Sequence, residues 1–292
     1  MRILVLGCKG QLGRCLSDQF MHTSYDVVYA SRIEIDISNF DATKNYILDI
    51  SPNIIINASA YTAVDQAEED YKTANLINHF AVSNIAEICK SLGSRLIHLS
   101  TDYVFDGCAN VAYTENDKTN PQSVYGKTKL KGELAIKSSG CEYFIIRTAW
   151  VYSEYGNNFL KTMLELGTQR ESLRIVGDQI GCPTYAQDIA KAIIKILPQS
   201  TSYKRNEIYH YCGSNRCSWH TFAELIFYEA NINGFKTPKK VSSISTSAYP
   251  TPAVRPMFSV LDCNKIETEF SILASNLEDG IQSSIKKLKK MR

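Results

Sequence analysis

Several features that would place the chain in a special class of protein are missing from its 292 residues. There is no apolar run of about 18 residues, the length that spans a bilayer, and no internal repeat or low-complexity segment. The N-terminus starts with a short apolar strand rather than the apolar region of a signal peptide. We therefore expect a soluble, cytoplasmic protein that does not bind a membrane.

The chain also has no large excess of positive or negative charge, because the formal net charge is only +2 and the charged residues are scattered along the chain. This pattern argues against a nucleic-acid partner. The basic C-terminal end, residues 286–290, is interpreted as a solvated last turn. The nine cysteines include no Cys-x-x-Cys pair and no Cys/His cluster of the kind that binds zinc. Free thiols in a reducing compartment are the expected state.

Short apolar runs alternate with amphipathic stretches through the first half of the chain. Continuous apolar strands that alternate with helices are typical of a parallel sheet covered on both faces. The prediction is an α/β fold with a Rossmann-like, doubly wound parallel sheet, in which ligands bind beyond the carboxyl ends of the strands. The expected strands are 2–6, 27–30, 54–57, 95–100 and 143–148, and the expected helices are 11–20, a stretch after residue 41, and 73–91.

The alternation becomes looser after about residue 150. We expect a dinucleotide-binding domain at 1–149 and a smaller C-terminal α/β substrate domain at 150–292. The segment at about 207–230 is apolar enough at its start to return to the main sheet, and 198–206 resembles a short linker. Helices are expected at 158–168, 188–197 and 219–231, with short strands at 173–176 and 207–213.

A glycine-rich turn, Gly7-Cys8-Lys9-Gly10-Gln11-Leu12-Gly13, follows the first expected strand. Glycines at these positions allow a sharp turn and close approach of the backbone to a pyrophosphate, while the helix N-terminus supplies N–H donors. The repeated strand-helix pattern favours a dinucleotide site over a simple turn.

The end of the second strand suggests which dinucleotide binds. An acidic residue there usually binds the ribose of NAD, but this chain has Ser31 and Arg32. A guanidinium suits a 2'-phosphate, so NADPH is the expected cofactor, with NADH possible. Asp36 could reach the adenine amino group, or it could simply belong to a helix N-cap region.

Thr101 follows the strand at 95–100, and Tyr125 and Lys129 follow it in the sequence, one helical turn apart. An ammonium about 4 Å from a phenol contributes about 4 kcal/mol at an effective dielectric of 20. The expectation is that Lys129 lowers the pKa of Tyr125 and makes it a proton donor or acceptor. A solvated helix start with a basic face is the alternative that these residues alone leave open. His98, inside an apolar strand, is interpreted as a core histidine.

Taken together, several segments in a fixed order resemble the extended short-chain dehydrogenase/reductase family, and within it the dTDP-4-dehydrorhamnose reductases. These segments are GCKGQLG, INASAYTAVDQAE, HLSTDYVFDG, VYGKTKLKGE, RTAWVY, GDQIGCPTYAQDIA and RPMFSVLD. The resemblance implies an oxidoreductase of dTDP-rhamnose and cell-wall polysaccharide biosynthesis. It implies NADPH-dependent reduction of the C4 keto group of dTDP-4-dehydro-6-deoxy-L-mannose to dTDP-L-rhamnose, although the chain alone leaves the 6-deoxytalose epimer open.

The resemblance also implies roles for individual residues. The catalytic positions are Thr101, Tyr125 and Lys129. The cofactor positions, beside Tyr125 and Lys129, are Gly7, Gly10, Gln11, Leu12, Gly13, Arg32, Asp36, Ile37, Ser59, Ala60 and Tyr61. The substrate positions are Thr101, Asp102, Trp150 and Arg255, although a Trp at a strand end is often a core residue and an Arg before a proline can simply brace a loop.

Three alternatives follow from the same resemblance. Related dehydratases have an Asp-Glu pair where this chain has Asp102-Tyr103, which favours simple carbonyl reduction; an epimerase is a further possibility. The regulatory beta subunit of methionine adenosyltransferase shares the fold without being an enzyme.

Some family members bridge a metal between subunits through carboxylates, but the matching positions here are Cys15 and Gln187. We therefore expect no bridging metal and a monomer or weak homodimer.

Overall fold

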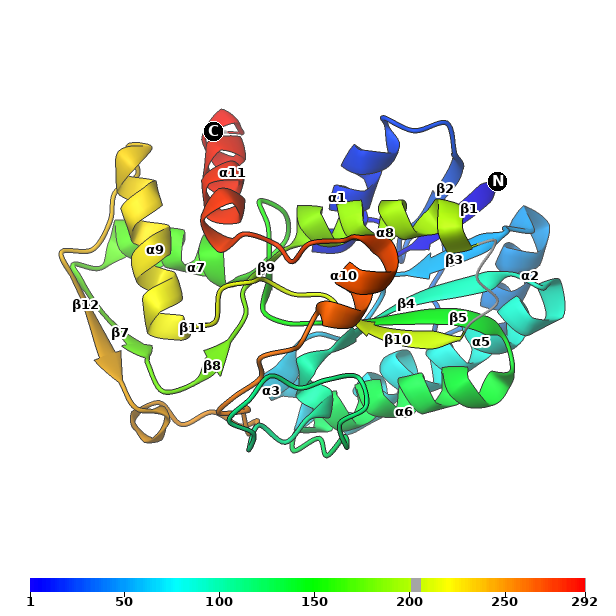
Figure 1. Cartoon of the computed structure of the whole chain (residues 1–292), viewed down its shortest axis with the longest axis horizontal. Coiled ribbons are helices and arrows are strands. Elements are labelled where there is room, and N and C mark those ends of the chain that lie inside the picture. Colours follow the sequence, from blue (N-terminus) through cyan, green and yellow to red (C-terminus); the bar gives the residue numbers. More distant parts are fainter. Residues whose placement is uncertain (201–205, 292) are drawn as a thin grey trace.

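The computed structural model describes residues 1–200 and 206–291. Its main element is a six-stranded sheet in the order β10-β5-β4-β3-β1-β2, in which every neighbouring pair is parallel (Figure 1). This confirms the predicted fold class. The strands are β1 (Arg2–Leu6), β2 (Asp26–Ala30), β3 (Ile54–Asn57), β4 (Arg95–Thr101), β5 (Glu142–Thr148) and β10 (Glu207–His210).

Helices cover both faces of this sheet (Figure 1), which explains why its strands are apolar on both sides. All four residues of β3 are buried, for example, and full burial of an isoleucine side chain contributes about 1.5–3 kcal/mol. One face packs on α1 (Gln11–Phe20), α8 (Ala186–Ser200) and α10 (Asn264–Phe270). The other face packs on α2 (Phe40–Ile50), α5 (Ala81–Leu92) and α6 (Val124–Ser139).

The helix predicted at 73–91 is interrupted in the structure. It consists of α4 (Tyr71–Asn75), a π-helical turn at Leu76–Phe80 and α5. Within the π turn, the buried Asn78 side chain accepts from Tyr61 N (2.9 Å) and donates to Tyr61 O (3.1 Å) and to Thr128 Oγ1 (3.2 Å). Periodicity does not show this turn, whose Asn78 contacts residues distant in sequence. Such turns are frequent at functional sites.

A second lobe lies beside the carboxyl ends of the sheet strands (Figure 1). Its core is rich in aromatic side chains, including Tyr152, Phe222 and Phe227. Its strands form three two-stranded pairs: β6 (Val151–Tyr152) with β9 (Thr184–Tyr185), β7 (Ser172–Val176) with β12 (Lys240–Ile244), and β8 (Ile180–Gly181) with β11 (Cys217–Ser218). Its helices are α7 (Phe159–Gln169), α9 (Trp219–Ile232) and α11 (Leu277–Lys290). The remaining short helices are α3 (Val64–Ala67) and the 3-10 turns Asp102–Val104 and Thr246–Ala248.

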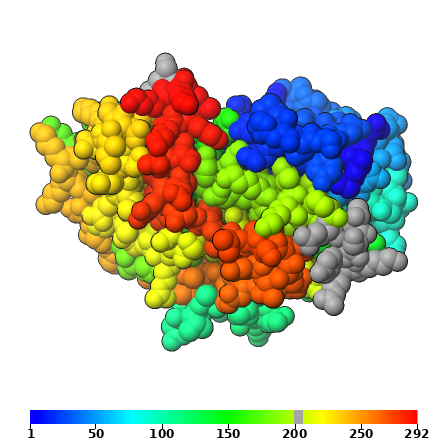
Figure 2. Space-filling view, turned by 45° about the horizontal axis from the view of Figure 1, so that its top comes forward, coloured from blue at the N-terminus to red at the C-terminus, as the bar shows by residue number. Residues whose placement is uncertain are grey.

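The chain crosses between the two lobes more than once. Strand β10 pairs with β5 at the sheet edge, and helices α8 and α10 pack on the sheet although they follow residue 150. In the space-filling view, α11 lies between the α9 region and the region of α1 and α8 (Figure 2). The linker predicted at 198–206 falls mostly on 201–205, outside the described residues. Within the described ranges, no helix is long and apolar enough to cross a membrane.

Candidate active site

A cavity of about 510 Å³ opens where the carboxyl ends of β1, β2 and β3 meet. The sheet order reverses between β1 and β3, the point at which open α/β sheets bind ligands. Many of the predicted cofactor residues lie around this cavity. Its lining includes Gly7, Gly10, Arg32, Asp36, Ile37, Ser59, Ala60 and Tyr61, together with Lys9, for which the sequence predicted no role.

The glycine turn leaves room for a ligand because its backbone packs closely. Gly7 has a φ of +79°, and a Cβ added there would lie 2.8 Å from Ser59 Oγ. A Cβ on Gly13 would lie 2.3 Å from Gly7 O, so only glycine lets α1 approach the turn. These contacts fit the expected pyrophosphate cradle.

The side chains of Gln11 and Leu12, in the same turn, do not line the cavity. Gln11 Oε1 accepts hydrogen bonds from Ser153 Oγ and Asn158 Nδ2, both at 2.9 Å. Leu12 packs against the apolar core on the face of the sheet that α1, α8 and α10 cover. Neither residue is part of the cavity lining. The structure therefore gives the side chain of Gln11 a partner in the second lobe, a contact that no local pattern predicted.

At the end of β2, the Arg32 side chain is 85% exposed and its guanidinium lies 3.1 Å from the carboxylate of Asp36. The Ser31 hydroxyl donates to the Glu34 carboxylate. Hydrogen bonds from Ser38 are the main cause that lowers the pKa of Asp36. Arg32 and Asp36 thus stand as a charged pair at the cavity rim, with the guanidinium open to an anionic ligand.

Tyr125 occupies the first turn of α6. Ser123 caps this helix, since its hydroxyl accepts from Gly126 N at 3.1 Å. The glycine between Tyr125 and Lys129 has a steric reason, because a Cβ on Gly126 would lie 2.2 Å from Tyr103 O. The resulting close approach sets the rings of Tyr103 and Tyr125 edge to face, with centroids 5.6 Å apart.

Thr101 and Asp102 meet Tyr125 at the end of β4. The Thr101 hydroxyl donates to Asp102 Oδ1 (3.0 Å) and accepts from Tyr103 N (3.2 Å). Thr101 also lies near enough to Tyr125 to influence the pKa of its phenol. Burial is the largest influence on Asp102 and raises the pKa of its carboxyl to about 6. The structure thus brings together the predicted residues Thr101, Asp102 and Tyr125.

The pKa of Tyr125 is not lowered as expected, and Lys129 is not among the groups that shift it. Burial dominates and raises the pKa of Tyr125 above its usual value, rather than an ammonium lowering it. Lys129 is itself buried, which lowers the pKa of its amine to about 8 and weakens it as a cation at the site. Its Nζ donates to Leu99 O at 2.6 Å and lies 3.3 Å from His98 Nε2. His98 is buried, as expected of a core histidine, but it also contacts this amine.

A second cavity, of about 590 Å³, lies in the second lobe. Its lining combines aromatic and basic side chains, among them Phe159, Trp219, Tyr249, Arg170, Arg174 and Arg255. Trp150 stacks on Trp219 with ring centroids 3.4 Å apart and an interplanar angle of 4°. Trp150 has a φ of +46°, a conformation that non-glycine residues rarely adopt. Trp150 therefore supports the cavity through Trp219.

Arg255 connects the two parts of the site. Its guanidinium forms an ion pair with Asp65 at 2.6 Å and donates to Tyr103 Oη at 3.1 Å. The loop-bracing role that the sequence left open is therefore present, while the side chain also lines the second cavity. Through Tyr103, these contacts lead from the second cavity to Tyr125.

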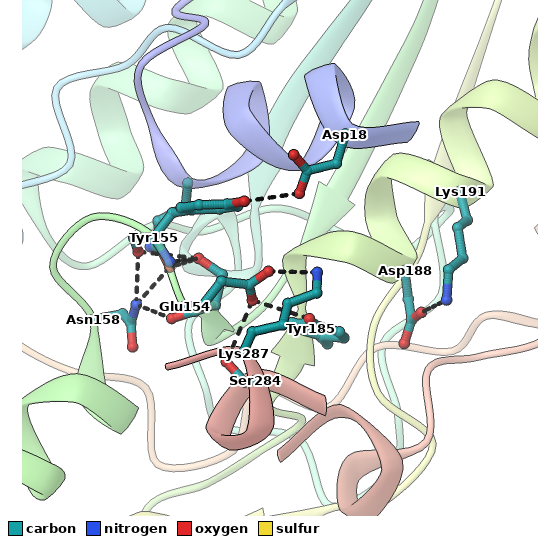
Figure 3. A network of polar contacts seen from close by, with 11 residues as sticks. Asp18, Glu154, Tyr155, Asn158, Tyr185, Asp188, Lys191, Ser284 and Lys287 are labelled. Carbon is teal, nitrogen blue, oxygen red and sulfur yellow. Dashed lines mark hydrogen bonds and ion pairs between the residues drawn. The ribbon is translucent and has the colours of Figure 1, made fainter. Parts of the chain in front are cut away.

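A polar network joins the lobes beside the glycine-turn helix (Figure 3). The carboxylate of Glu154, which is fully buried, lies 2.6 Å from Lys287 Nζ and accepts from Tyr185 Oη at 3.0 Å. Nearby, Tyr155 Oη donates to Asp18 on α1 at 2.9 Å. The expectation that the basic C-terminal end is only a solvated turn was wrong for Lys287, because a buried carboxylate from a distant segment pairs with it.

The two positions from which we expected no bridging metal are both buried, Cys15 fully and Gln187 nearly so. Among the described residues, no group of three or more His, Cys, Asp or Glu side chains is arranged to hold a metal ion. The expectation about metal and subunit contacts stays a prediction.

Known proteins share both the sequence and this architecture. A family model described as the RmlD substrate binding domain matches residues 1–290. A dTDP-4-dehydrorhamnose reductase from Sinorhizobium fredii is 42% identical over 285 residues, which cover 96% of this chain and 95% of that protein. The dTDP-4-dehydrorhamnose reductase of Escherichia coli K12 is 37% identical, with 99% and 98% covered. This chain belongs to the dTDP-4-dehydrorhamnose reductase family.

Solved structures of this reductase family agree closely with the fold. A dTDP-4-dehydrorhamnose reductase from Clostridium acetobutylicum superposes with a TM-score of 0.92 at 37% identity, covering 99% of this chain and 100% of that one. The enzyme from Bacillus anthracis, solved in complex with NADP, gives 0.91 at 35% identity, covering 98% and 99%. A UDP-glucose 4-epimerase from Thermus thermophilus, at 17% identity, shares the fold alone.

Proposed function

We propose that this chain is a dTDP-4-dehydrorhamnose reductase, which reduces the C4 keto group of dTDP-4-dehydro-6-deoxy-L-mannose to give dTDP-L-rhamnose. The observation that carries the proposal is the meeting of Thr101, Asp102 and Tyr125 at the carboxyl edge of the sheet, linked through Tyr103 and Arg255 to the second cavity. Reductase relatives that match nearly the whole chain support it.

The cavity at β1, β2 and β3 fits a nicotinamide dinucleotide, which supplies the reducing equivalents when bound. Gly7 and Gly10 bring backbone groups to the cavity, and Ser59 and Tyr61 line it at the end of β3. We propose NADPH as the preferred form, with NADH as the weaker alternative, because the exposed Arg32 can pair with a 2'-phosphate. The NADP-bound relative agrees with this choice.

Tyr125 is the proposed general acid. Reduction of a ketone leaves negative charge on the substrate oxygen, and a nearby proton donor stabilises it in the transition state. The raised pKa of Tyr125 keeps the phenol protonated at neutral pH, so it is ready to donate. Thr101, which lies near the phenol, orients the carbonyl, while Lys129 supports the site from within the protein and would bind the nicotinamide ribose of a bound cofactor.

The second cavity is proposed to hold the nucleotide end of the substrate. Arg170, Arg174 and Arg255 bring positive charge for a diphosphate, and Trp219 offers an apolar face for the base. In this division, residues 1–149 with the returning strand β10 bind the cofactor and the rest of 150–292 binds the sugar nucleotide. We further propose that the protein works without a bridging metal, as a monomer or weak homodimer.

Product identification by NMR tests the proposal. The purified chain is incubated with NADPH and dTDP-4-dehydro-6-deoxy-L-mannose, and the configuration at C4 of the product is read from its proton couplings. The expected result is dTDP-L-rhamnose with stoichiometric oxidation of NADPH. Unchanged substrate with tight NADPH binding would instead indicate a non-catalytic binding protein, and the 6-deoxytalose epimer would correct the assigned product.

A further inference from the structure

We propose that the side chain of Gln11 links the two cavities, so that a dinucleotide bound at the glycine turn also orders helix α7, which forms one wall of the second cavity. Gln11 and Asn158 are then positioning residues, whose side chains line neither cavity. This link rests on the proposed function, because it takes the cavity at β1, β2 and β3 as the cofactor site.

The amide oxygen of Gln11 is held from two sides by the second lobe. Gln11 Oε1 accepts from Ser153 Oγ and from Asn158 Nδ2, both at 2.9 Å. The loop between these two partners lies close against the same side chain, because a Cβ added to Gly156 would lie 3.0 Å from Gln11 Cγ. Segment 153–158 therefore packs directly on the first residue of α1.

A backbone contact fixes the direction of the hydrogen bond between Gln11 and Asn158. Asn158 is the N-cap of α7, and its Oδ1 accepts from Lys161 N at 3.2 Å. A backbone N–H can only donate, so the amide oxygen of Asn158 is turned toward α7 and its NH2 group toward Gln11. The atom of Gln11 that meets this NH2 group must be its oxygen. The residue that caps α7 is thus the residue that Gln11 holds.

Helix α7 carries this contact to the second cavity. Phe159, directly after Asn158, and Met163, one turn further along, both line that cavity. The ring of Phe159 also packs on Trp219, with centroids 4.7 Å apart. A displacement of Asn158 would therefore move the wall against which the base of the substrate is proposed to bind.

On the other side, Gln11 adjoins the proposed pyrophosphate site. It is the first residue of α1, and Gly10 before it lines the first cavity. The N–H groups in the first turn of a helix have no partner within the helix, and they are the donors that bind phosphate groups. A ligand held by this turn restricts the backbone of Gln11 and, through its side chain, the N-terminus of α7. Coupling through ordering of this kind is detected by hydrogen exchange.

Hydrogen exchange measured by mass spectrometry, with and without NADPH, tests the link. In wild-type protein, NADPH should slow exchange of the peptide covering 157–166 by about three- to tenfold, the factor that corresponds to one hydrogen bond. Gln11→Met keeps the side-chain length without the acceptor, and Asn158→Ser keeps a capping oxygen but is too short to reach Gln11. Both variants should lose this slowing, although NADPH still saturates them in a fluorescence titration. The contact of Tyr155 with Asp18 is expected to keep the loop on α1 in both (Figure 3).

A matched control is Asn276→Ser. Asn276 caps α11 in the same lobe, where its Oδ1 accepts from Asp279 N at 3.0 Å, so the effect of NADPH on 157–166 should stay as in wild type. Slowing that is absent from wild type, that persists in Gln11→Met, or that is lost equally in Asn276→Ser contradicts the link. Wild-type protein that shows the slowing but does not turn over the keto-sugar nucleotide would instead contradict the proposed function alone.

Discussion

The sheet lobe and the second lobe place their polar side chains by different means. In the sheet lobe, parallel strands end at one edge, so residues far apart in sequence, such as Gly7 at β1 and Thr101 at β4, meet at that edge. In the second lobe, some paired strands are only two residues long, so they do little to position polar side chains. Contacts between side chains, such as the Trp150–Trp219 stack, position the cavity residues instead. Backbone topology therefore positions the site residues of the sheet lobe, and side-chain packing positions those of the second lobe.

The largest effect is expected from the sheet edge, at Tyr125. Tyr125→Phe removes the proposed proton donor and keeps the ring that packs on Tyr103, so kcat should fall by about 10²- to 10⁴-fold. Affinity for NADPH, measured by fluorescence titration, should change little. Tyr228→Phe, at a residue 69% exposed on α9, is the control. A kcat within twofold of wild type would remove Tyr125 from the mechanism.

The next effect concerns the buried carboxylate of Glu154, in the second lobe. Lys287→Gln leaves the fully buried carboxylate of Glu154 without its cation, and an uncompensated buried charge costs about 3 kcal/mol or more. We expect a free energy of unfolding lower by about this amount in urea titrations. In the exposed pair of Lys239 and Glu171, Glu171→Gln should cost less than about 0.5 kcal/mol. Equal small effects would mean that the Glu154–Lys287 pair does not stabilise the fold.

Tyr125 and the Glu154–Lys287 pair differ in how well the sequence predicts them. The apolar strands and the glycine turn follow from local patterns, and the Thr101–Tyr125 pairing follows from where strands end. The Glu154–Lys287 pair joins residues 133 positions apart, and no periodicity marks it. The sequence also could not predict the direction of the pKa shift at Tyr125, because that direction depends on burial rather than on the spacing of Tyr125 and Lys129.

A smaller effect is expected at the cavity rim, where Arg32 lines the proposed cofactor site. Arg32→Gln removes the proposed partner of the 2'-phosphate. The ratio of kcat/KM for NADPH to that for NADH should fall about tenfold, since a hydrogen bond to a charged group contributes about 1.5 kcal/mol. Arg216→Gln, at an exposed loop position, should leave the ratio unchanged. A ratio that does not move would assign cofactor preference to other residues.

The smallest effect is expected in the second lobe. Trp219→Leu removes the aromatic face that lines the second cavity and stacks on Trp150. Such stacking contributes about 1 kcal/mol, so KM for the sugar nucleotide should rise about fivefold while the KM for NADPH stays constant. A change in kcat alone would place Trp219 nearer to the reacting carbon than we propose.

The state of the Tyr125 phenol tests the account most directly, because the proton donor must be neutral when substrate binds. In protein carrying 13Cζ-labelled tyrosine, with Tyr125→Phe used to assign the signal, the Tyr125 resonance is followed as the pH is raised. Since burial raises the pKa of this phenol, we predict that it stays protonated at pH 10, where free tyrosine is half ionised. Ionisation of Tyr125 below about pH 8 would contradict the account and restore the lysine-lowered phenol that the sequence first indicated.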